Sequence, residues 1–303
     1  QIEAFVDDGD RRRGVAGTDP VAGVLVRGAH DFPWRHATEP FDACVFQLGN
    51  ERCHDYIWPY MVRYPGLVVI HDGQLHQARA ASLIERDHLD QYRAEFSYCH
   101  PRAPHALHEV VICGMADAIA SMYYDHPMVR IPVEAARVAA VHNRLLAEEL
   151  SEKHPGATIV PIRQGVRDLT VGEAGRIDGL RTRLGIPEQA VVFVAFGRAT
   201  PEKRLPAIVK ALGQVVTSGC RPDPWLLCVG ATADYYDVRR DAEVNGVTDR
   251  VVVTSYVPDG ELGRYLALAD ACLCLRWPTG RETSAAWLRC LAAGKPTVIS
   301  GLA

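Results

Sequence analysis

A glycine and two cationic side chains stand close together in Phe196–Arg204, whose sequence is Phe-Gly-Arg-Ala-Thr-Pro-Glu-Lys-Arg. Gly197 follows an apolar run, and a glycine there lets the backbone approach a ligand closely. Arg198 and Lys203 project from the following turn and from the start of the next expected helix. Two cations near a helix N-terminus suit a diphosphate group. Taken alone, the segment is equally typical of a basic loop before a surface helix.

A second candidate segment is Leu275–Ser284, where an apolar run gives way to a Pro/Gly loop and then to Glu282, Thr283 and Ser284. Glu282 can accept hydrogen bonds from sugar hydroxyls, and the N–H groups of the helix that begins here can face a ligand. In the alternative interpretation, Glu282 and Ser284 are ordinary first-turn residues that suit the helix dipole.

Short apolar runs that alternate with helical stretches must position these side chains. Several runs are continuous and rich in Val and Leu, as is typical of strands buried on both faces. The runs expected to form strands are Phe41–Leu48, Gly66–Ile70, Arg137–Val141, Ala157–Ile162, Ala190–Phe196, Trp225–Val229, Arg250–Thr254, Ala271–Leu275 and Pro296–Ile299. Helical spacing marks Asn143–Lys153, Gly175–Leu184, Leu205–Thr217, Glu261–Ala269 and Ala285–Ala293. The alternation predicts an α/β fold with parallel sheets and helices on both faces.

The chain has 303 residues, a length that favours two domains. A polar stretch near Pro161–Thr170 predicts the boundary, with one domain over residues 1–162 and a second over 163–303. Ligands of open α/β sheets sit beyond the carboxyl ends of the strands, so the polar residues that follow each strand matter most. They are Gly49 and Asn50, His71 and Asp72, His142 and Asn143, Gly197 and Arg198, Gly230, and Arg276 through Glu282.

Together the two segments resemble glycosyltransferase family 4, a family of retaining enzymes with the GT-B fold. The resemblance lies in a Gly-Arg-x-x-x-Glu-Lys turn at 197–203 and in a Pro-x-x-x-Glu helix start at 278–282. That helix ends in Ala-Ala-Gly-Lys-Pro at 292–296. The resemblance implies two Rossmann-like domains that face each other across a cleft. The first would be the acceptor-side domain and the second the nucleotide-sugar domain.

The resemblance also implies roles for particular residues. Arg198 and Lys203 match the pair that binds the donor diphosphate, and Gly197 lies beside them. Glu282 matches the first of two glutamates and would face the donor sugar, with Thr283 and Ser284 next to it. His71 would stand near the reacting sugar. The catalytic set is thus His71, Arg198, Lys203 and Glu282, and the donor-binding set is Gly197, Arg198, Lys203, Glu282, Thr283 and Ser284.

This sequence departs from the family pattern at one position. The second glutamate, which typically holds the ribose hydroxyls, should lie eight residues after Glu282, where the chain has Cys290. The departure puts the ribose contact in question and leaves the phosphate and sugar contacts matched. We also expect the family's first strand with its Gly-rich loop to precede Gln1 and the closing helices to follow Ala303. The GT-B fold would then be incomplete at both ends.

The implied activity is retaining transfer of a sugar from a nucleoside-diphosphate sugar to a hydroxyl group. The acceptor would be a glycan, a lipid-linked molecule or a small molecule in cell-surface polysaccharide or glycoconjugate synthesis. No paired carboxylates suit double displacement, so a same-face mechanism is favoured. No cofactor beyond the donor and no metal is expected, because fixed cations can stabilise the leaving diphosphate. Two alternatives remain open: an epimerase or hydrolase of the same fold, and a catalytically silent nucleotide-sugar-binding subunit.

Composition narrows the class of protein further. The formal net charge is −4 and no basic stripe is present, which argues against a nucleic-acid binder. The nine cysteines are scattered, many of them in apolar runs, and are typical of a reducing compartment. No apolar stretch approaches the roughly 18 residues of a membrane span. These features predict a cytoplasmic protein, with peripheral contact at the inner face of the membrane left open.

Two metal-like patterns are discounted. Asp8-Gly9-Asp10 has the form of an Asp-x-Asp motif but lacks the context of the fold that uses it. His100, His105, His108 and Glu109 are interrupted by prolines and are expected to lie in a flexible, partly exposed loop. His76 is expected to pack on a helix, and Asn143 to cap the helix that follows it.

Overall fold

The structure is a computed structural model of the whole chain. It describes residues 1–7, 23–104, 106–115, 121–166, 179–219 and 221–301. Within this part, the chain forms two compact units, each described here by itself. The first unit comprises Gln1–Arg163 together with the short segment Gly280–Thr283. The second comprises Gln164–Thr279 and Ser284–Ala303.

The first unit is built on a four-stranded parallel sheet with the order β3-β4-β5-β6. The strands are β3 (Val45–Leu48), β4 (Leu67–Ile70), β5 (Val138–Val141) and β6 (Ile159–Pro161). The central strands β4 and β5 pair from Leu67 with Val138 to Ile70 with Val141. Three residues at the end of each are fully or almost fully buried. Such continuous apolar strands form because helices cover both faces of a parallel sheet.

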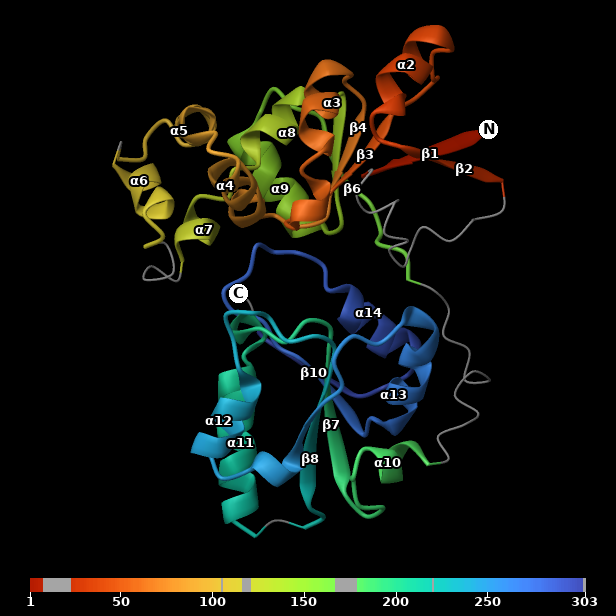
Figure 1. The fold of residues 1–303 in the computed structure, drawn as a ribbon, viewed down its shortest axis with the longest axis vertical. Helices are drawn as coiled ribbons and strands as arrows, with labels where there is room; N and C mark the ends of the chain where they lie inside the picture. The colour runs from red at the N-terminus through yellow and green to blue at the C-terminus, as the bar shows by residue number, and fades with distance from the viewer. Residues whose placement is uncertain (8–22, 105, 116–120, 167–178, 220, 302–303) are drawn as a thin grey trace. The chain divides into compact units, whose positions relative to one another are not determined.

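Helices of the first unit fall into two groups, as Figure 1 shows. Those around the sheet are α2 (Asp31–Thr38), α3 (Ile57–Arg63), α8 (Arg130–Ala135) and α9 (Arg144–Lys153), with the short 3-10 helix η1 (Arg52–His54). Those that extend to one side are α4 (His76–Glu85), α5 (Leu89–Cys99), α6 (Leu107–Ile112) and α7 (Met122–Asp125). The second group has its own small core around Tyr92 and Phe96.

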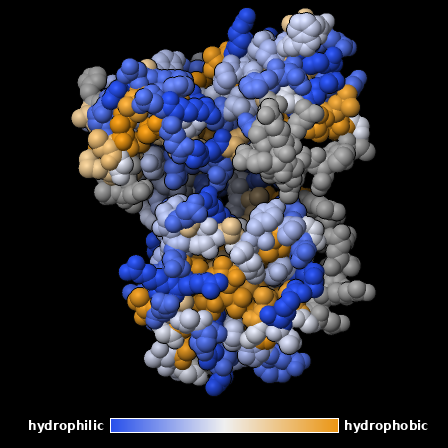
Figure 2. Space-filling model, in the orientation of Figure 1, coloured by the Kyte–Doolittle hydropathy of each residue, from blue (hydrophilic) through white to orange (hydrophobic). Residues whose placement is uncertain are grey.

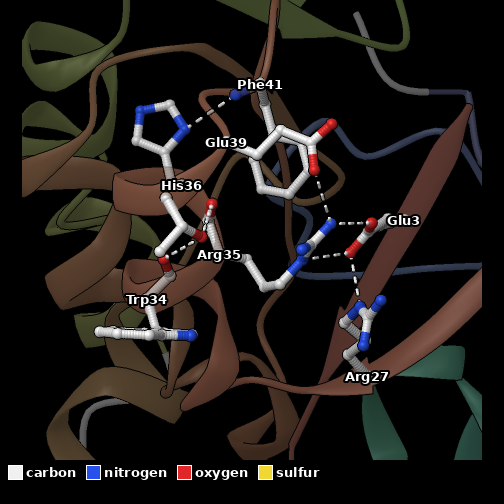
Figure 3. A network of polar contacts seen from close by, with 8 residues as sticks. Glu3, Arg27, Trp34, Arg35, His36, Glu39 and Phe41 are labelled. Atoms are coloured by element: carbon white, nitrogen blue, oxygen red, sulfur yellow. Dashed lines mark hydrogen bonds and ion pairs between the residues drawn. The ribbon is translucent and has the colours of Figure 1, made fainter.

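A two-stranded parallel sheet, β1 (Ile2–Val6) with β2 (Val24–Gly28), completes the first unit. Our sequence analysis missed both strands. The side chain of Glu3 in β1 is only 4 % exposed and lies between two arginines. Its carboxylate accepts from Arg27 Nε at 2.5 Å and from Arg35 Nη2 at 2.7 Å (Figure 3). This charge pairing ties α2 to the small sheet.

The second unit has a five-stranded parallel sheet with the order β11-β10-β7-β8-β9. Its strands are β7 (Val191–Phe196), β8 (Pro224–Val229), β9 (Val251–Val253), β10 (Ala271–Cys274) and β11 (Thr297–Ile299). Central strands β7 and β8 pair in register from Val191 with Pro224 to Phe196 with Val229. After β8 and β9 extend the sheet on one side of β7, the chain returns and adds β10 on the other side. Open parallel sheets bind ligands at such a point, beyond the carboxyl ends of the strands.

Helices lie on both faces of this sheet, α11 and α12 on one and α13 and α14 on the other (Figure 1). The helices are α10 (Leu180–Arg183), α11 (Leu205–Thr217), α12 (Val238–Val244), α13 (Leu262–Leu268) and α14 (Ala285–Ala292). Short 3-10 helices are η4 (Pro201–Lys203), η5 (Thr248–Arg250) and η6 (Asp259–Glu261). Figure 2 shows hydrophobic surface gathered on the visible face of this unit. Two buried clusters, one on each face of the sheet, form its core.

Every apolar run that we expected to be a strand forms one, with bounds within a few residues. The α/β character and the parallel sheets are therefore confirmed. The predicted helix Gly175–Leu184 is described only from 179 onward, as α10. Asp8-Gly9-Asp10 and His105 lie outside the described residues.

Of the two described histidines in the expected loop, His108 contradicts the expectation because it is helical, whereas His100 lies in a partly exposed position just after a helix. His100 follows α5 directly, and His108 lies in α6. Both rings pack against Phe96, with centroid separations of 5.1 and 5.9 Å. The cause is an aromatic cluster, whose members come from separate helices and are not apparent in one segment of sequence.

Candidate active site

The carboxyl ends of β7 and β10 bring together three cationic residues of the second unit, which are Arg198, Lys203 and Arg276. Gly197 directly follows β7 and has a positive φ of 84°. This backbone conformation favours glycine, and a Cβ atom here would also lie 2.6 Å from Lys203 Nζ, so the lysine end would have to move. Gly230, at the end of β8, is equally restricted, because a Cβ there would lie 2.5 Å from the Gly197 carbonyl oxygen. The backbone at this edge of the sheet is thus closely packed and bare of side chains.

Lys203 does not extend from a helix start, as the sequence suggested. It ends the 3-10 turn η4, and its Nζ donates a hydrogen bond back to the Phe196 carbonyl. Burial, and then the positive charge of Arg276, lower the pKa of Lys203 to about 8. The Lys203 side chain is therefore charged in most molecules at neutral pH. It lies at the end of β7, where the Phe196 carbonyl balances its charge only in part. Such a group favours the arrival of an anion.

Arg198 is the exposed member of the group. Its side chain is 47 % exposed, and its Nη2 lies 3.9 Å from the carboxylate of Asp234. An ion pair this long and this exposed contributes little to stability. The guanidinium can therefore leave Asp234 for a phosphate, which it can bind through two N–H groups.

Arg276 was recognised in the sequence only as a polar residue after a strand, and we assigned it no role. It lies two residues beyond β10, and its backbone N–H donates to Ser300 Oγ at 2.9 Å. Its charge acts on Lys203 across adjacent strands, as the lowered lysine pKa shows. The pairing of β10 with β7 brings Arg276 to this site. The sequence does not show that β10 is the neighbour of β7, so it could not indicate this position for Arg276.

The segment after β10 that contains Glu282 has no regular secondary structure until Ser284. Ser284 caps α14, because its side-chain oxygen accepts a hydrogen bond from the Trp287 N–H at 3.2 Å. Glu282 and Thr283 precede this cap and belong to Gly280–Thr283, the segment that is grouped with the first unit. A donor-sugar role for Glu282 and Thr283 beside Arg198 and Lys203 thus stays a prediction.

Cys290 is buried in α14, at the position where the family pattern has its second glutamate. Hydrogen bonds with the thiols of Cys272 and Cys274, and then burial, raise the pKa of Cys290. These three sulfur groups belong to the core between α14 and β10. The exposed cysteines of the described chain, Cys53 and Cys113, are both in the first unit. Position 290 therefore contributes a packed thiol and no carboxylate.

In the first unit, the carboxyl ends of β3, β4 and β5 bring several polar side chains together. His71 follows β4, and its Nε2 lies 2.8 Å from Gln47 Oε1 in β3. His71 Nδ1 lies 2.9 Å from Nε2 of His142, which follows β5. Asp72 accepts a hydrogen bond from the Asn50 N–H at 2.8 Å. The His71–His142 contact was not foreseen, because 71 residues separate the two histidines.

Two further residues singled out in the sequence, His76 and Asn143, have structural roles in the first unit. His76 is fully buried in α4, and its Nε2 lies 2.8 Å from Tyr92 Oη, which confirms its expected packing role. Asn143 caps α9 as expected, since its Oδ1 accepts from the Leu146 N–H at 2.8 Å. Within the described ranges, no group of His, Cys, Asp and Glu is arranged to hold a metal ion. In the same ranges, every helix is too short or too polar to cross a bilayer.

Comparison with known proteins finds a family model that matches a segment of the second unit. Residues 190–303 match the model of a family described as glycosyl transferases group 1. This range begins one residue before β7 and includes Gly197, Arg198, Lys203 and Arg276. The resemblance expected from the two motifs is therefore confirmed. At the level of sequence, no curated protein matches the chain.

Solved structures extend the likeness to both units. WaaG, a glycosyltransferase involved in lipopolysaccharide biosynthesis, is 14% identical with a TM-score of 0.58, over 99% of this chain and 80% of WaaG. Sucrose-phosphate synthase from Thermosynechococcus elongatus is 16% identical with a TM-score of 0.53, over 90% of this chain and 59% of the synthase. The UDP-forming α,α-trehalose-phosphate synthase from Burkholderia xenovorans is 11% identical with a TM-score of 0.51, over 93% of this chain and 74% of the synthase.

At these identities the likeness shows the fold alone. The relatives are GT-B glycosyltransferases with two Rossmann-like domains, and the predicted fold class is confirmed. The chain spans 59% of the length of the sucrose-phosphate synthase.

Proposed function

We propose that this protein is a retaining glycosyltransferase that moves a sugar from a nucleoside-diphosphate sugar to a hydroxyl acceptor. The observation that carries the proposal is the set of cations at the ends of β7 and β10, inside the segment that matches the glycosyltransferase family. Arg198, Lys203 and Arg276 would bind the diphosphate. In the transition state they would stabilise the negative charge that grows on the leaving nucleotide.

The remaining roles follow the same scheme. Glu282, with Thr283 and Ser284, would bind the donor sugar, and His71 would lie near the reacting centre. Fixed side-chain cations can replace a metal in this task, so we propose that no metal or further cofactor is needed. Synthesis of cell-surface polysaccharide or glycoconjugate is the proposed setting, with a glycan, lipid-linked or small-molecule acceptor.

One assay separates this function from its alternatives. The full-length protein is incubated with each of a panel of nucleotide sugars plus EDTA, with and without candidate acceptors, and products are followed by NMR. We expect donor consumption that depends on an acceptor and a glycosidic bond that keeps the donor's anomeric configuration. Equal consumption without acceptor would indicate a hydrolase or epimerase. Binding without consumption would indicate a silent subunit.

Replacement of Lys203 by alanine is expected to weaken donor binding by about 10- to 100-fold, because one charge-assisted hydrogen bond contributes roughly 1.5–3 kcal/mol. The fold should persist, since the lysine has no acidic partner among the groups that shift its pKa. Isothermal titration with the nucleoside diphosphate measures the dissociation constant, and thermal melting serves as the folding control. An unchanged dissociation constant would remove Lys203 from the donor site.

Donor affinity is also expected to fall as the pH rises above about 8, the pKa of Lys203. The charged form binds the diphosphate more tightly than the neutral amine does, so the loss approaches about tenfold per pH unit until it reaches the loss expected for Lys203→Ala. Lys203→Arg is the matched control, because arginine stays charged over this range. Its affinity should vary little between pH 7 and 9.5. Parallel pH profiles for the two proteins would contradict this assignment.

A further inference from the structure

His71 has a protein group within hydrogen-bonding distance of each ring nitrogen. Nε2 lies 2.8 Å from Gln47 Oε1, and Nδ1 lies 2.9 Å from His142 Nε2. The two imidazole centroids are 4.9 Å apart, with the rings tilted by 36°. These contacts form a continuous series of side chains across the carboxyl ends of β3, β4 and β5. His71 is therefore held at both ends of its ring.

The chemistry of these groups fixes the direction of donation. An amide oxygen can only accept, so His71 Nε2 must carry a hydrogen. A neutral imidazole carries only one, so His71 Nδ1 accepts from the N–H at His142 Nε2. The unprotonated nitrogen of the pair is then His142 Nδ1, a buried atom that makes no hydrogen bond of ordinary geometry with the described residues, although the Ile162 backbone acts on the pKa of this ring.

The electrostatic surroundings favour the neutral form of both rings. Burial, then the charges of His142 and His54, lower the pKa of His71. Burial also lowers the pKa of His142, although a backbone contact with Ile162 and the charge of Asp72 oppose this effect. A second proton on His71 would set an N–H at Nδ1 against the N–H of His142. The pair therefore resists protonation as long as the contact between the rings persists.

We propose that His142 is a positioning residue, which holds His71 in the tautomer with its hydrogen on Nε2. His71 then acts on substrate as a neutral hydrogen-bond donor and takes no proton. Gln47 is exposed, and its amide oxygen occupies the place that a sugar hydroxyl oxygen would take. Exchange of that oxygen for a substrate oxygen leaves the His142 contact intact. The substrate part of this inference rests on the proposed function, and the tautomer part stands on the geometry alone.

The experiment uses the full-length protein with ¹⁵N-labelled histidine, and long-range ¹H–¹⁵N spectra that distinguish protonated from bare ring nitrogens. We expect Nε2 of His71 to be protonated and Nδ1 bare in the unmodified protein. His142→Phe keeps the bulk of a ring but lacks the donor, so a mixture of His71 tautomers should appear. His142→Gln supplies an amide N–H and should restore the single tautomer.

Kinetics test the consequence for turnover. His142→Phe should lower kcat about tenfold with little change in KM for the donor, and should move the acid limb of the pH profile to higher pH. His71 Nδ1 can then accept a proton without facing an N–H group. His142→Gln should recover most of kcat. His154→Phe, at a half-buried histidine that follows α9, is the matched control and should change neither readout.

A single, unchanged His71 tautomer in folded His142→Phe would overturn the positioning role, whatever the kinetics. So would a tautomer mixture that appears equally in His154→Phe. Failure of the proposed function has a different signature, because the unmodified protein would then transfer no sugar while the spectra still report the tautomer.

Discussion

Replacement of Arg79 by methionine is expected to lower the free energy of unfolding of the first unit by about 3–5 kcal/mol. Arg79 is 7 % exposed, and its guanidinium binds Asp55 Oδ1 at 2.6 Å and both carboxylate oxygens of Glu95 at 2.6 and 2.8 Å. The group also stacks 4.5 Å from the ring centroid of Trp58. Its removal leaves Glu95, which is 14 % exposed, with only the Gln91 amide, and leaves Asp55, which is 6 % exposed, with Arg86 as its remaining cation among the described residues. An unpaired buried charge, rather than the lost attraction, causes most of the effect.

Arg93→Met is the matched control for this prediction. Arg93 lies in the neighbouring helix α5 and pairs with Glu109 at 2.7 Å, but these side chains are 36 and 43 % exposed. Its replacement should cost at most about 1 kcal/mol. Urea unfolding gives the free energies, and hydrogen exchange in α4 and α5 assigns the transition to the first unit. A loss for Arg79→Met as small as that of the control would contradict the prediction.

The first unit is also expected to lose stability steeply in acid, chiefly below pH 6.5. Burial lowers the pKa of His76 to about 3 and that of His100 to about 4, from an unfolded value near 6.5. In that pH range the unfolded chain therefore binds more protons than the folded one, so stability falls as the pH falls. The loss from His76 alone reaches about 3 kcal/mol at pH 4, at 1.36 kcal/mol per pKa unit.

His76→Gln tests the contribution of this one residue. Glutamine can still bond Tyr92 Oη but does not titrate, so the variant should lose less stability than the unmodified protein between pH 7 and 4.5. Hydrogen-exchange protection of α4 and α5, corrected for the intrinsic pH dependence of exchange, provides the measurement. The quantity to compare is the change in stability between pH 7 and pH 4.5, because the substitution itself can shift the stability by the same amount at both pH values. Identical acid losses in the two proteins would show that His76 is not responsible.

The sequence was sufficient to predict the two larger sheets, because their strands form short apolar runs and the central strands are buried on both faces. Helix α11 was also predicted with its observed bounds, Leu205–Thr217, since its apolar spacing is regular. Strand β1 was missed because it contains Glu3. A buried carboxylate is tolerated there only through Arg27 and Arg35, which lie 24 and 32 residues away. No local pattern reports such a partner.

The candidate site could likewise be predicted only in part from the sequence. Gly197, Arg198 and Lys203 lie within one turn, so their type and spacing could be recognised directly. The inward fold of Lys203 onto the Phe196 carbonyl depends on the positive φ of Gly197 and could not be. Arg276 and His142 reach their neighbours through strand pairing, β10 with β7 and β5 with β4. The order of strands in a sheet, which the sequence does not state, decides those contacts.

Among the described cysteines, exposure differs between the two units and so does the expected reactivity toward labels. Cys53 and Cys113 are exposed on the first unit, whereas Cys228, Cys272 and Cys290 are enclosed in the second. A maleimide dye should therefore select the first two over the three enclosed thiols, with every native cysteine left in place. Cys53 lies next to His54, whose Nδ1 is 2.9 Å from the backbone oxygen of Gln47. A dye at Cys53 would thus stand one residue from His54, which contacts the backbone of Gln47, the residue whose side chain contacts His71.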